Sequence, residues 1–525
     1  MTGRLDDLIT TLSDPSIYPH HPASVQVVQT HISVVFIAGE LVYKIKKPVD
    51  LGFLDFTTLE KRKYFCHQEV RLNSRFSEGI YLGVAAIHGG PSGINLKGEG
   101  TEIEAAVLMR HIPYERLFIG MLHNNEVTPE LLDRLADRLA YFHSHAAGGP
   151  QITSFGSNHV IYQNLKENFE QTIAFIGRTI DAQTHEAVST LALEFLEKHQ
   201  SLFQERMARG FIRDCHGDLH LEHVVILDEI MLYDCIEFND RFRYCDTAAD
   251  LAFLLMDLDF IGYPAFADRI AVRYAERSGD REILRLLGFY KSYRAFVRGK
   301  VEGFILDEAE VSESERQSAR ETAKKYFALS LAYLKPPRPP LLVITTGLMG
   351  TGKSYLASRL GQRLGIRPLR SDVIRKEIQG LSPLARRFER YGTGIYSAEA
   401  TEQTYEALFE RAAKALQGGE SVIVDASFGR FGHRERARAL AHKAGARFRL
   451  VECKAPQAVI RRRMEERVIK EDEPSDGRWE IFKEQEAHFE PVRQDESSLT
   501  RSWDSATDLD GFLASFVWEL MFASQ

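Results

Sequence analysis

The hydrophobic pattern is clearest in the last third of the chain, where short apolar runs alternate with longer amphipathic stretches. Apolar runs that predict buried strands cover 341–346, 421–425 and 448–453, and stretches with helical periodicity, such as 400–416, lie between them. Buried strands separated by helices are typical of a parallel sheet covered by helices on both faces. We therefore predict an α/β domain built on such a sheet over residues 341–525.

A proline-rich segment marks where this domain begins. Four of the five residues 336–340 are proline, and such a run cannot continue a helix but favours a stiff, extended connector. A long stretch that favours helix, 313–333, precedes this segment. We expect one domain over 1–335, a linker over 336–340 and a second domain over 341–525.

The N-terminal part has a different pattern. Apolar residues concentrate in two arms, 31–37 and 41–46, on either side of the short turn between them, and this pattern predicts a β-hairpin. A helix is expected over 59–73, capped by Thr57 or Thr58. Most segments from 128 to 335 are expected to be helical, apart from a strand–loop–strand region at 211–238, so this domain is predicted to be of the α+β class.

Composition and charge narrow the class of protein. The 525 residues are 44% hydrophobic and 27% charged, with a net charge of -8, which fits a globular protein and gives no reason to expect a surface built for nucleic acid or membranes. No apolar run reaches the roughly 18–20 residues that cross a bilayer, and the first ten residues lack the apolar segment of a signal peptide. The five cysteines form no CxxC pair, which indicates neither a zinc site nor a disulfide framework. A cytoplasmic protein is the simplest expectation.

The strongest motif follows the apolar run 341–346 directly. Its eight residues satisfy the pattern GxxxxGK[ST]: Gly347, Leu348, Met349, Gly350, Thr351, Gly352, Lys353 and Ser354. Glycines in this pattern let backbone N–H groups surround phosphate groups, and the next helix presents its positive end to the same anion. Lys353 can reach the β- and γ-phosphates of ATP, while the Ser354 hydroxyl is a Mg²⁺ ligand. We predict a binding site for ATP and Mg²⁺.

Two carboxylates and an arginine extend this predicted site. Asp372 and Arg375 are three positions apart and so share one helical face, where Asp372 can accept the proton of an attacking hydroxyl and Arg375 can hold an anionic group. Asp425 ends an apolar strand, which would bring it to the carboxyl edge of the sheet, where it suits Mg²⁺. A surface ion pair and a helix cap are the respective alternatives.

Further arginines follow on predicted helices. Arg463 and Arg467 are four positions apart and can close over the transferring phosphoryl group as a lid. Arg434 and Arg436, in the basic run 430–438, point to an anionic acceptor. A solvated, charged helix face explains either pair equally well.

Residues 341–500 together resemble the P-loop kinases of small molecules and of polynucleotide 5′-ends. The resemblance implies a parallel sheet, an acceptor-binding helix after the second strand and a lid that carries arginines. The spacing of Asp372 and Arg375 looks most like the arrangement in polynucleotide kinases. Gluconate kinases and zeta-type toxins share the phosphate loop, so the acceptor stays open.

A second group of chemistry-bearing residues lies in the N-terminal domain, in the string CHGDLHLEH at 215–223. An aspartate on a tight, glycine-containing loop, here Asp218, can orient a hydroxyl, and an acidic group after a strand, here Glu237, can bind a metal. Upstream, Lys44 of the hairpin is expected to pair with Glu69 on the next helix. Kinases hold phosphates with such a lysine–glutamate pair.

This pattern resembles the aminoglycoside phosphotransferase family and its choline-kinase relatives, within the protein-kinase-like fold, over residues 25–330. The resemblance implies a bilobal domain with Asp218 as the catalytic base, and His216 is expected to anchor the loop. The family has Asn where this chain has His223 and Asp where it has Glu237. Mg²⁺ prefers oxygen ligands, whereas an imidazole suits ions of the zinc or manganese type. His223 and Glu237 are therefore predicted metal ligands of altered geometry.

These patterns predict an ATP-dependent phosphotransferase that acts on an alcohol group. The C-terminal domain would transfer the γ-phosphoryl group to a hydroxyl-bearing small molecule or to a 5′-hydroxyl nucleic acid, with no membrane partner. The N-terminal domain would be a second kinase, or a non-catalytic module that selects the substrate. A regulator that hydrolyses ATP without an acceptor is the third hypothesis, which the acceptor-type pair Asp372 and Arg375 disfavours.

Overall fold

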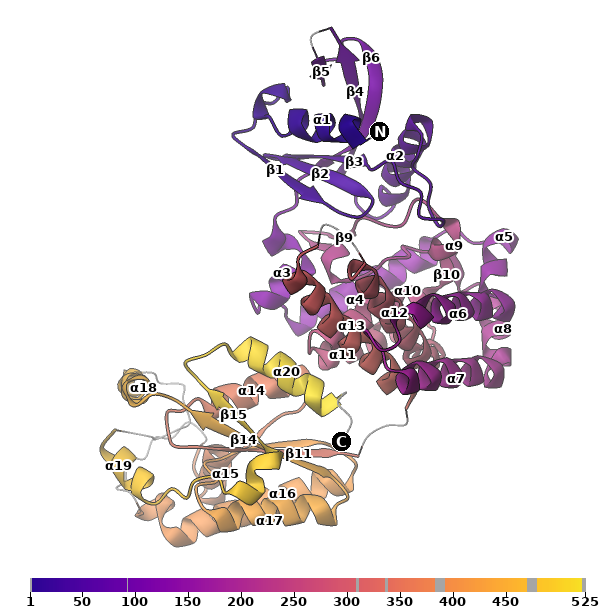
Figure 1. Ribbon diagram of the computed structural model, residues 1–525. Helices are drawn as coiled ribbons and strands as arrows, with labels where there is room; N and C mark the ends of the chain where they lie inside the picture. Colours follow the sequence, from indigo (N-terminus) through magenta and orange to yellow (C-terminus); the bar gives the residue numbers. More distant parts are fainter. Residues whose placement is uncertain are drawn as a thin grey trace. The chain divides into compact units, whose positions relative to one another are not determined.

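The computed structural model describes residues 2–91, 93–307, 311–335, 339–382, 392–469 and 479–521, without the side chains of 2–4, 467–469 and 480 (Figure 1). The chain divides into two compact units, Met1–Leu258 with Ala267–Leu334, and Lys335–Gln525 with Asp259–Phe266. Of the predicted linker, residues 336–338 lie outside the described residues. Among the helices described, none combines the length and the apolar character needed to cross a bilayer.

The first lobe of the N-terminal unit is an antiparallel sheet of six strands in the order β1-β2-β3-β6-β4-β5. Its elements are β1 (Val25–Gln29), β2 (Ser33–Ala38), β3 (Leu41–Lys46), β4 (Tyr81–Gly90), β5 (Gly93–Asn95) and β6 (Thr101–Arg110), with the helices α1 (Thr2–Leu12) and α2 (Leu59–Asn73). The predicted hairpin is confirmed as β2 and β3, which pair from Ser33 with Lys46 to Ala38 with Leu41. The prediction missed β4 and β6, of which β6 lies between β3 and β4 in the centre of the sheet.

The helix α2 covers part of this sheet with an unusually polar face. Thr58 is its N-cap, with a hydroxyl that accepts from the Lys61 backbone N–H, as expected of a threonine there. The buried residues of α2 include Arg62 and Glu69. Because a buried charge needs a partner, this face predicts ion pairs between the helix and the sheet.

The second lobe is mainly helical, as expected. Its helices are α3 (Phe118–His123), α4 (Pro129–His145), α5 (Pro150–Thr153), α6 (Asn158–Thr172), α7 (Ala182–Lys198), α8 (Gln200–Ala208), α9 (Asp240–Arg243), α10 (Thr247–Phe260), α11 (Pro264–Ser278), α12 (Ile283–Ile305) and α13 (Glu313–Leu334). Four short strands form two antiparallel pairs, β7 (Ile212–Asp214) with β10 (Tyr244–Asp246) and β8 (Val224–Ile226) with β9 (Ile230–Leu232). The bilobal, kinase-like fold predicted for this unit is confirmed.

The C-terminal unit is the predicted α/β domain, with five parallel strands in the order β12-β13-β11-β14-β15. The strands are β11 (Leu341–Thr346), β12 (Leu369–Arg370), β13 (Val422–Asp425), β14 (Arg447–Lys454) and β15 (Thr500–Asp504). The helices are α14 (Lys353–Leu364), α15 (Ser371–Ile378), α16 (Ala398–Gln417), α17 (Phe431–Lys443), α18 (Gln457–Ile469), α19 (Trp479–Ala487) and α20 (Leu509–Met521). The sheet is therefore the parallel sheet that the alternating pattern predicts.

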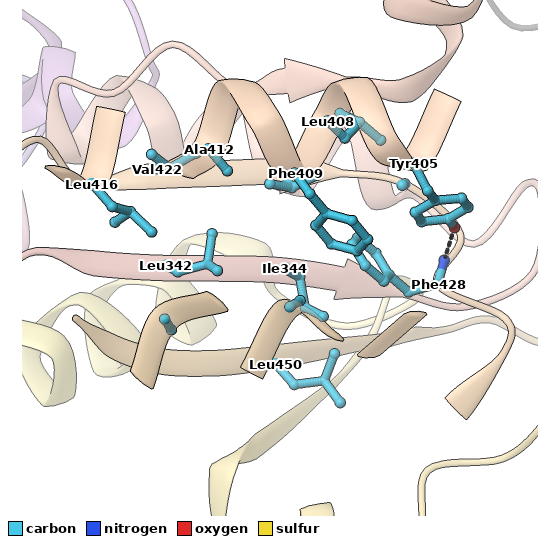
Figure 2. Close-up of a cluster of buried hydrophobic side chains, with 14 of the residues drawn as sticks. Leu342, Ile344, Tyr405, Leu408, Phe409, Ala412, Leu416, Val422, Phe428 and Leu450 are labelled. Carbon is cyan, nitrogen blue, oxygen red and sulfur yellow. Dashed lines mark hydrogen bonds between the residues drawn. The ribbon is translucent and has the colours of Figure 1, made fainter. Parts of the chain in front are cut away.

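Successive residues of a strand point to opposite faces of a sheet, and in this sheet both faces are buried. Leu342 and Ile344 of β11 pack with residues of α16 and α17 on one face (Figure 2). Leu341 and Val343 pack with residues of α14 and α20 on the other. Such two-sided burial explains why β11 is apolar at every one of these positions.

The segment after β13 has an unusual backbone. Phe428 is fully buried and has a φ of 41°, a left-handed conformation that few side chains adopt. Its backbone N–H donates to the Tyr405 hydroxyl over 2.9 Å, which Figure 2 marks with a dashed line. The hydroxyl of Thr346, at the end of β11, donates to the Ser427 and Phe428 carbonyls at 3.1 and 3.2 Å. These contacts fix the end of β13 against the end of β11.

Candidate functional site

The phosphate loop lies where β11 ends and α14 begins, at the carboxyl edge of the parallel sheet. Gly347 has a φ of 137°, and a Cβ at this position would lie 2.4 Å from the Cys453 carbonyl oxygen. Only glycine fits here, because this close approach and this backbone conformation exclude a side chain. Gly352, with a φ of 92°, immediately precedes α14, so the free N–H groups of the first helical turn face the loop.

Lys353 and Thr351 both donate to one carbonyl of the loop. The Lys353 Nζ donates to the Leu348 carbonyl over 2.8 Å, and the Thr351 hydroxyl donates to the same carbonyl over 2.7 Å. An ammonium group held by a neutral carbonyl can exchange it for an anion, since charge-assisted contacts are roughly twice as strong as neutral ones. The lysine is therefore already inside the loop that a phosphate would enter.

Asp425 lies beside the loop because β13 is the neighbour of β11 in the sheet. Its side chain is buried, which raises the pKa of this carboxyl group, although a hydrogen bond with Ser354 and the charges of Lys353 and Arg370 lower it in part. The Ser354 hydroxyl and the Asp425 carboxylate thus form a pair of oxygen donors. This donor set fits Mg²⁺, which takes hard oxygen ligands and keeps several waters.

Asp372 and Arg375 follow β12 in α15, at the same edge of the sheet. Asp372 is half-buried in the first turn of α15, near enough to Asp425 to raise the pKa of that carboxyl group. Arg375 is buried and donates to the Ile395 carbonyl at 2.8 Å and the Thr401 hydroxyl at 3.3 Å. The structure thus gives the Arg375 guanidinium structural partners that the sequence did not predict.

The lid arginines were predicted on one helix, and that helix, α18, contacts the loop. Arg463 donates to the Gly350 carbonyl at 3.3 Å and to the Ser505 hydroxyl at 2.6 Å. From α19, the Gln485 side chain accepts the Met349 backbone N–H at 2.8 Å. The Arg467 side chain lies outside the described residues.

Arginines of the basic run in α17 form ion pairs with carboxylates of the same domain. Arg434 is almost completely buried and donates to both carboxylate oxygens of Glu496 at 2.8 and 2.9 Å. Arg436 pairs with Glu402 at 2.6 Å and Glu406 at 2.7 Å. The interpretation of Arg434 and Arg436 as a site for an anionic acceptor is therefore corrected, because both guanidinium groups have carboxylate partners.

In the N-terminal unit, two lysines of β3 meet three carboxylates from two other segments. Lys44 contacts Glu69 at 2.9 Å and Asp234 at 2.5 Å. Lys46 contacts Glu69 at 2.7 Å and pairs closely with Glu237. The predicted ion pair of Lys44 with Glu69 is present. Burial opposes the charged form of Lys44, but the charges of Asp234 and Glu69 outweigh it and raise the pKa of Lys44.

Glu237 differs from the predicted arrangement. It is buried, with its carboxylate against Lys46, and burial raises its pKa despite this partner. Separating a buried carboxylate from its ammonium partner leaves a buried, unpaired charge, which carries a large penalty in free energy. The predicted role of Glu237 and His223 as metal ligands stays a prediction.

Asp250 of α10 anchors the loop that carries Asp218. Its carboxylate accepts the backbone N–H groups of His216 at 3.1 Å and Gly217 at 2.8 Å, and the His143 ring at 3.1 Å. The His216 ring bonds to the Tyr233 carbonyl at 2.9 Å, which confirms its predicted anchoring role.

Asp218 itself is about one-third exposed and lies near two imidazoles. Its Oδ2 is 3.6 Å from His220 Nε2 and 3.7 Å from His223 Nδ1. Burial opposes the charged carboxylate, but the two histidines outweigh it and lower the pKa of Asp218. For His220 the Asp218 charge likewise outweighs burial and raises its pKa.

Sequence reasoning missed three residues of this site: Lys46, Asp234 and Asp250. Lys46 is two positions from Lys44 on the same strand, and therefore on the same face of the sheet, so the alternation could have indicated it. Asp234 lies in the same segment as Glu237, with a φ of 61° that the sequence does not reveal. Nothing in the local pattern marks Asp250, which reaches the loop from a distant helix.

Both units match known family models. Residues 66–287 match the model described as the phosphotransferase enzyme family, and residues 342–492 match the model described as an AAA domain. Uncharacterized protein Rv2004c of Mycobacterium tuberculosis is 31% identical over 437 residues, which cover 82% of this chain and 85% of that protein. An uncharacterized protein of Mycobacterium bovis matches with the same figures.

Solved structures that resemble part of this chain include three that are described as kinases. A choline/ethanolamine kinase family protein from Mesorhizobium loti is 12% identical and covers 62% of this chain and 99% of its own, with a TM-score of 0.37. A gluconokinase from Sinorhizobium meliloti is 19% identical and covers 35% and 95%, with a TM-score of 0.26. The APS kinase CysC of Mycobacterium tuberculosis, in complex with AMPPNP and APS, is 22% identical and covers 35% and 99%, also with a TM-score of 0.26.

Proposed function

Since the chain belongs to the same family as these mycobacterial proteins, with a phosphotransferase-type domain followed by a P-loop domain, we propose that its P-loop domain transfers the γ-phosphoryl group of ATP to a hydroxyl acceptor. One observation carries this proposal. The phosphate loop, the Ser354–Asp425 pair and Asp372 meet at the carboxyl edge of one parallel sheet, where open α/β sheets bind their ligands.

In this proposal the loop N–H groups and Lys353 bind the phosphates of ATP, and Lys353 leaves the Leu348 carbonyl to do so. Ser354 and Asp425 hold Mg²⁺, which neutralises charge on the phosphates when it is bound. Asp372 accepts the proton of the acceptor hydroxyl. The acceptor oxygen forms a bond to the γ-phosphorus, the bond from that phosphorus to the bridging oxygen breaks, and ADP leaves.

The arginines have different proposed roles. Arg463, already at the Gly350 carbonyl, neutralises charge on the transferring group, and Arg467 stays a prediction of the same kind. Arg375 acts by bracing residues 395–401 beside α15, since its Nη1 donates to the Ile395 carbonyl and the Thr401 hydroxyl there. The acceptor class stays as predicted from the sequence, a hydroxyl-bearing small molecule or a polynucleotide 5′-end.

The N-terminal unit is proposed either as a second kinase, with Asp218 as base, or as a module that selects the substrate. The anchored Asp218 loop favours a kinase, whereas the pairing of Glu237 with Lys46 favours the module. The third hypothesis, a regulator that only hydrolyses ATP, is disfavoured by the position of Asp372 at the sheet edge.

The test compares wild type, Lys353→Ala, Asp218→Ala and the matched control Lys443→Ala, an exposed lysine at the end of α17. Each is incubated with labelled ATP and sugars, sugar acids, aminoglycosides and 5′-hydroxyl oligonucleotides. Lys353→Ala should reduce transfer roughly 100- to 1,000-fold, the scale for losing one group that stabilises the transition state, and Lys443→Ala should act as wild type. Unchanged transfer by Lys353→Ala would refute the proposal, and label released only as phosphate would favour the regulator.

A further inference from the structure

The metal site implied by kinase folds does not fit the N-terminal unit as it stands. That site needs two oxygen donors, at the positions of His223 and Glu237. The first offers an imidazole, which Mg²⁺ disfavours. The second is buried against Lys46, which also contacts Glu69. Lys46 would keep Glu69, but its pair with Glu237 is almost inaccessible, with side chains 1% and 6% exposed. Separating this pair is therefore more unfavourable than separating the partly exposed pair of Lys44 and Asp234, at 15% and 35%.

A different set of donors lies beside these two positions. Asp218, His220 and His223 each bring one donor atom within 4.8 Å of the other two, and Asp234 Oδ2 lies 3.7 Å from His223 Nε2. Metal–ligand bonds of 2.0–2.1 Å in a tetrahedral site place neighbouring donor atoms about 3.3 Å apart. The spacings of 3.6 Å between Asp218 Oδ2 and His220 Nε2 and of 3.7 Å between Asp234 Oδ2 and His223 Nε2 are therefore a few tenths of an ångström from that geometry.

The tautomer of His223 is fixed by its surroundings. Its Nδ1 lies 2.8 Å from the Asp218 backbone carbonyl, and since a carbonyl can only accept, Nδ1 must carry the hydrogen. In the neutral ring the lone pair is then on Nε2, which faces Asp234. Metal-ligating histidines are oriented in this way, with the second nitrogen bonded to a carbonyl or a carboxylate.

Asp234 has the accessibility that Glu237 lacks. About a third of its side chain is exposed, whereas that of Glu237 is nearly inaccessible. Its left-handed φ of 61° is a strained conformation for a non-glycine residue, and such strain concentrates at functional sites. The Tyr81 hydroxyl accepts the Asp234 backbone N–H at 3.0 Å and helps to hold this conformation.

Charge also favours a cation here. The carboxylates of Asp218, Asp234, Glu69 and Glu237 face two ammonium groups, those of Lys44 and Lys46. Asp257 and Arg298, which interact with His220 and Asp218, offset each other. These carboxylate and ammonium groups alone sum to two negative charges, which a divalent cation would neutralise.

We propose that Asp218, His220, His223 and Asp234 form a site for a divalent cation of the borderline type, such as Zn²⁺, Co²⁺ or Mn²⁺, in place of a Mg²⁺ site at His223 and Glu237. Two nitrogen and two oxygen donors are the mixed set that such ions accept and Mg²⁺ does not. Lys44 would then release Asp234 and keep Glu69 as its partner. The proposal goes beyond the P-loop activity, because it concerns the other unit.

The experiment titrates Co²⁺ into the full-length, metal-stripped protein in excess Mg²⁺, which occupies the oxygen-rich site of the P-loop unit. Binding is followed by the visible absorption of Co²⁺, and Zn²⁺ is added as a competitor. His223→Asn and Asp234→Asn should each weaken Co²⁺ binding by roughly 100-fold, the upper end of the losses caused by disturbing a metal site. His159→Asn, at an exposed histidine of α6, is the matched control and should bind as wild type.

Circular dichroism and thermal unfolding of the metal-free variants establish that each is folded, and His220→Gln is a second ligand variant should one fail. Wild-type affinity in both His223→Asn and Asp234→Asn would overturn the proposal. So would a thiolate charge-transfer band, which would assign the ion to a cysteine, or a loss in Glu237→Gln with none in Asp234→Asn. Because the readout is metal binding, these outcomes are independent of phosphoryl transfer by the P-loop unit.

Discussion

Asp250 is the residue whose loss tests most directly how the Asp218 loop is held. Its fully buried carboxylate accepts two backbone N–H groups of that loop, from His216 and Gly217, and the His143 ring. Asp250→Asn keeps the shape of the side chain but replaces one acceptor oxygen by an N–H₂ group. At least one buried N–H then faces another donor, because asparagine has a single acceptor atom.

Two routes give the size of the expected effect. A hydrogen bond to a charged group contributes about 1.5–3 kcal/mol, and an orphaned buried donor costs about 1–3 kcal/mol, so a loss of about 2–4 kcal/mol is expected. Separately, although burial opposes its charge, the His143 hydrogen bond and nearby charges lower the pKa of Asp250 from 3.8 to about 2. At 1.36 kcal/mol per pKa unit, this shift corresponds to about 2.5 kcal/mol.

The pH dependence has a definite sign. A carboxyl group with a lowered pKa in the folded state contributes its stability above the unfolded value of 3.8 and loses it as the pH falls toward 2. The difference between wild type and Asp250→Asn should therefore be constant from pH 5 to 8. Below pH 4 it should become smaller.

The assay must separate the two units, and the chain offers a means of doing so. All three tryptophans, Trp479, Trp503 and Trp518, lie in the C-terminal unit, so their fluorescence reports the unfolding of that unit alone. Hydrogen exchange of peptides from 212–226 reports the Asp218 loop. Asp250→Asn should speed exchange there by roughly 30- to 1,000-fold, the equivalent of 2–4 kcal/mol, and leave the fluorescence transition unchanged.

Asp137→Asn is the matched control, since Asp137 of α4 pairs with Arg273 at the surface and exposed pairs contribute little. Wild-type exchange at 212–226 in Asp250→Asn would refute the account of how the loop is held. A difference that already vanishes at pH 5 would refute the assigned charge of Asp250.

Two further predictions concern the P-loop unit. Gly347→Ala would place a Cβ 2.4 Å from the Cys453 carbonyl oxygen, so it should lower the free energy of unfolding of this unit by about 2–3 kcal/mol and weaken ATP binding. Tryptophan fluorescence in urea measures the stability and calorimetry the ATP binding, and wild-type stability would contradict the geometry. Arg434→Ala leaves Glu496 buried without its guanidinium partner and should lower the free energy of unfolding by about 3–5 kcal/mol. Arg436→Ala, at a half-exposed pair, should lower it by under about 1 kcal/mol, and equal effects in the same urea assay would contradict this distinction.

The architecture was predictable where burial leaves a periodic pattern. The two-sided burial of β11 makes it apolar throughout, and the hairpin of β2 and β3 alternates around a short turn. The central strands β4 and β6 were missed, because glycine and alanine, which have little strand propensity, interrupt or dilute their patterns. Strand β12 has only two residues, too few for any periodicity.

The site was predictable where chemistry demands a fixed spacing, as in the phosphate loop, and less so where the role of a side chain depends on its partners. Arg375 and Arg434 look like anion-binding arginines in the sequence, yet both donate inside the fold. Lys46 and Glu237 neutralise each other, which no local pattern indicates. Contacts between residues about 190 positions apart are set by tertiary packing alone.

The edge strand β15 and the helix α20 have a practical consequence for anyone who prepares the P-loop unit by itself. The family match ends at residue 492, but Trp503, Leu513 and Phe516 belong to the hydrophobic cluster that covers one face of the sheet, together with Leu341 and Val343. A version cut at 492 would present that face to solvent, and exposed apolar faces of this kind cause aggregation. A version that continues through Met521 retains the cover, and with it the chance of a well-behaved sample for ligand screening.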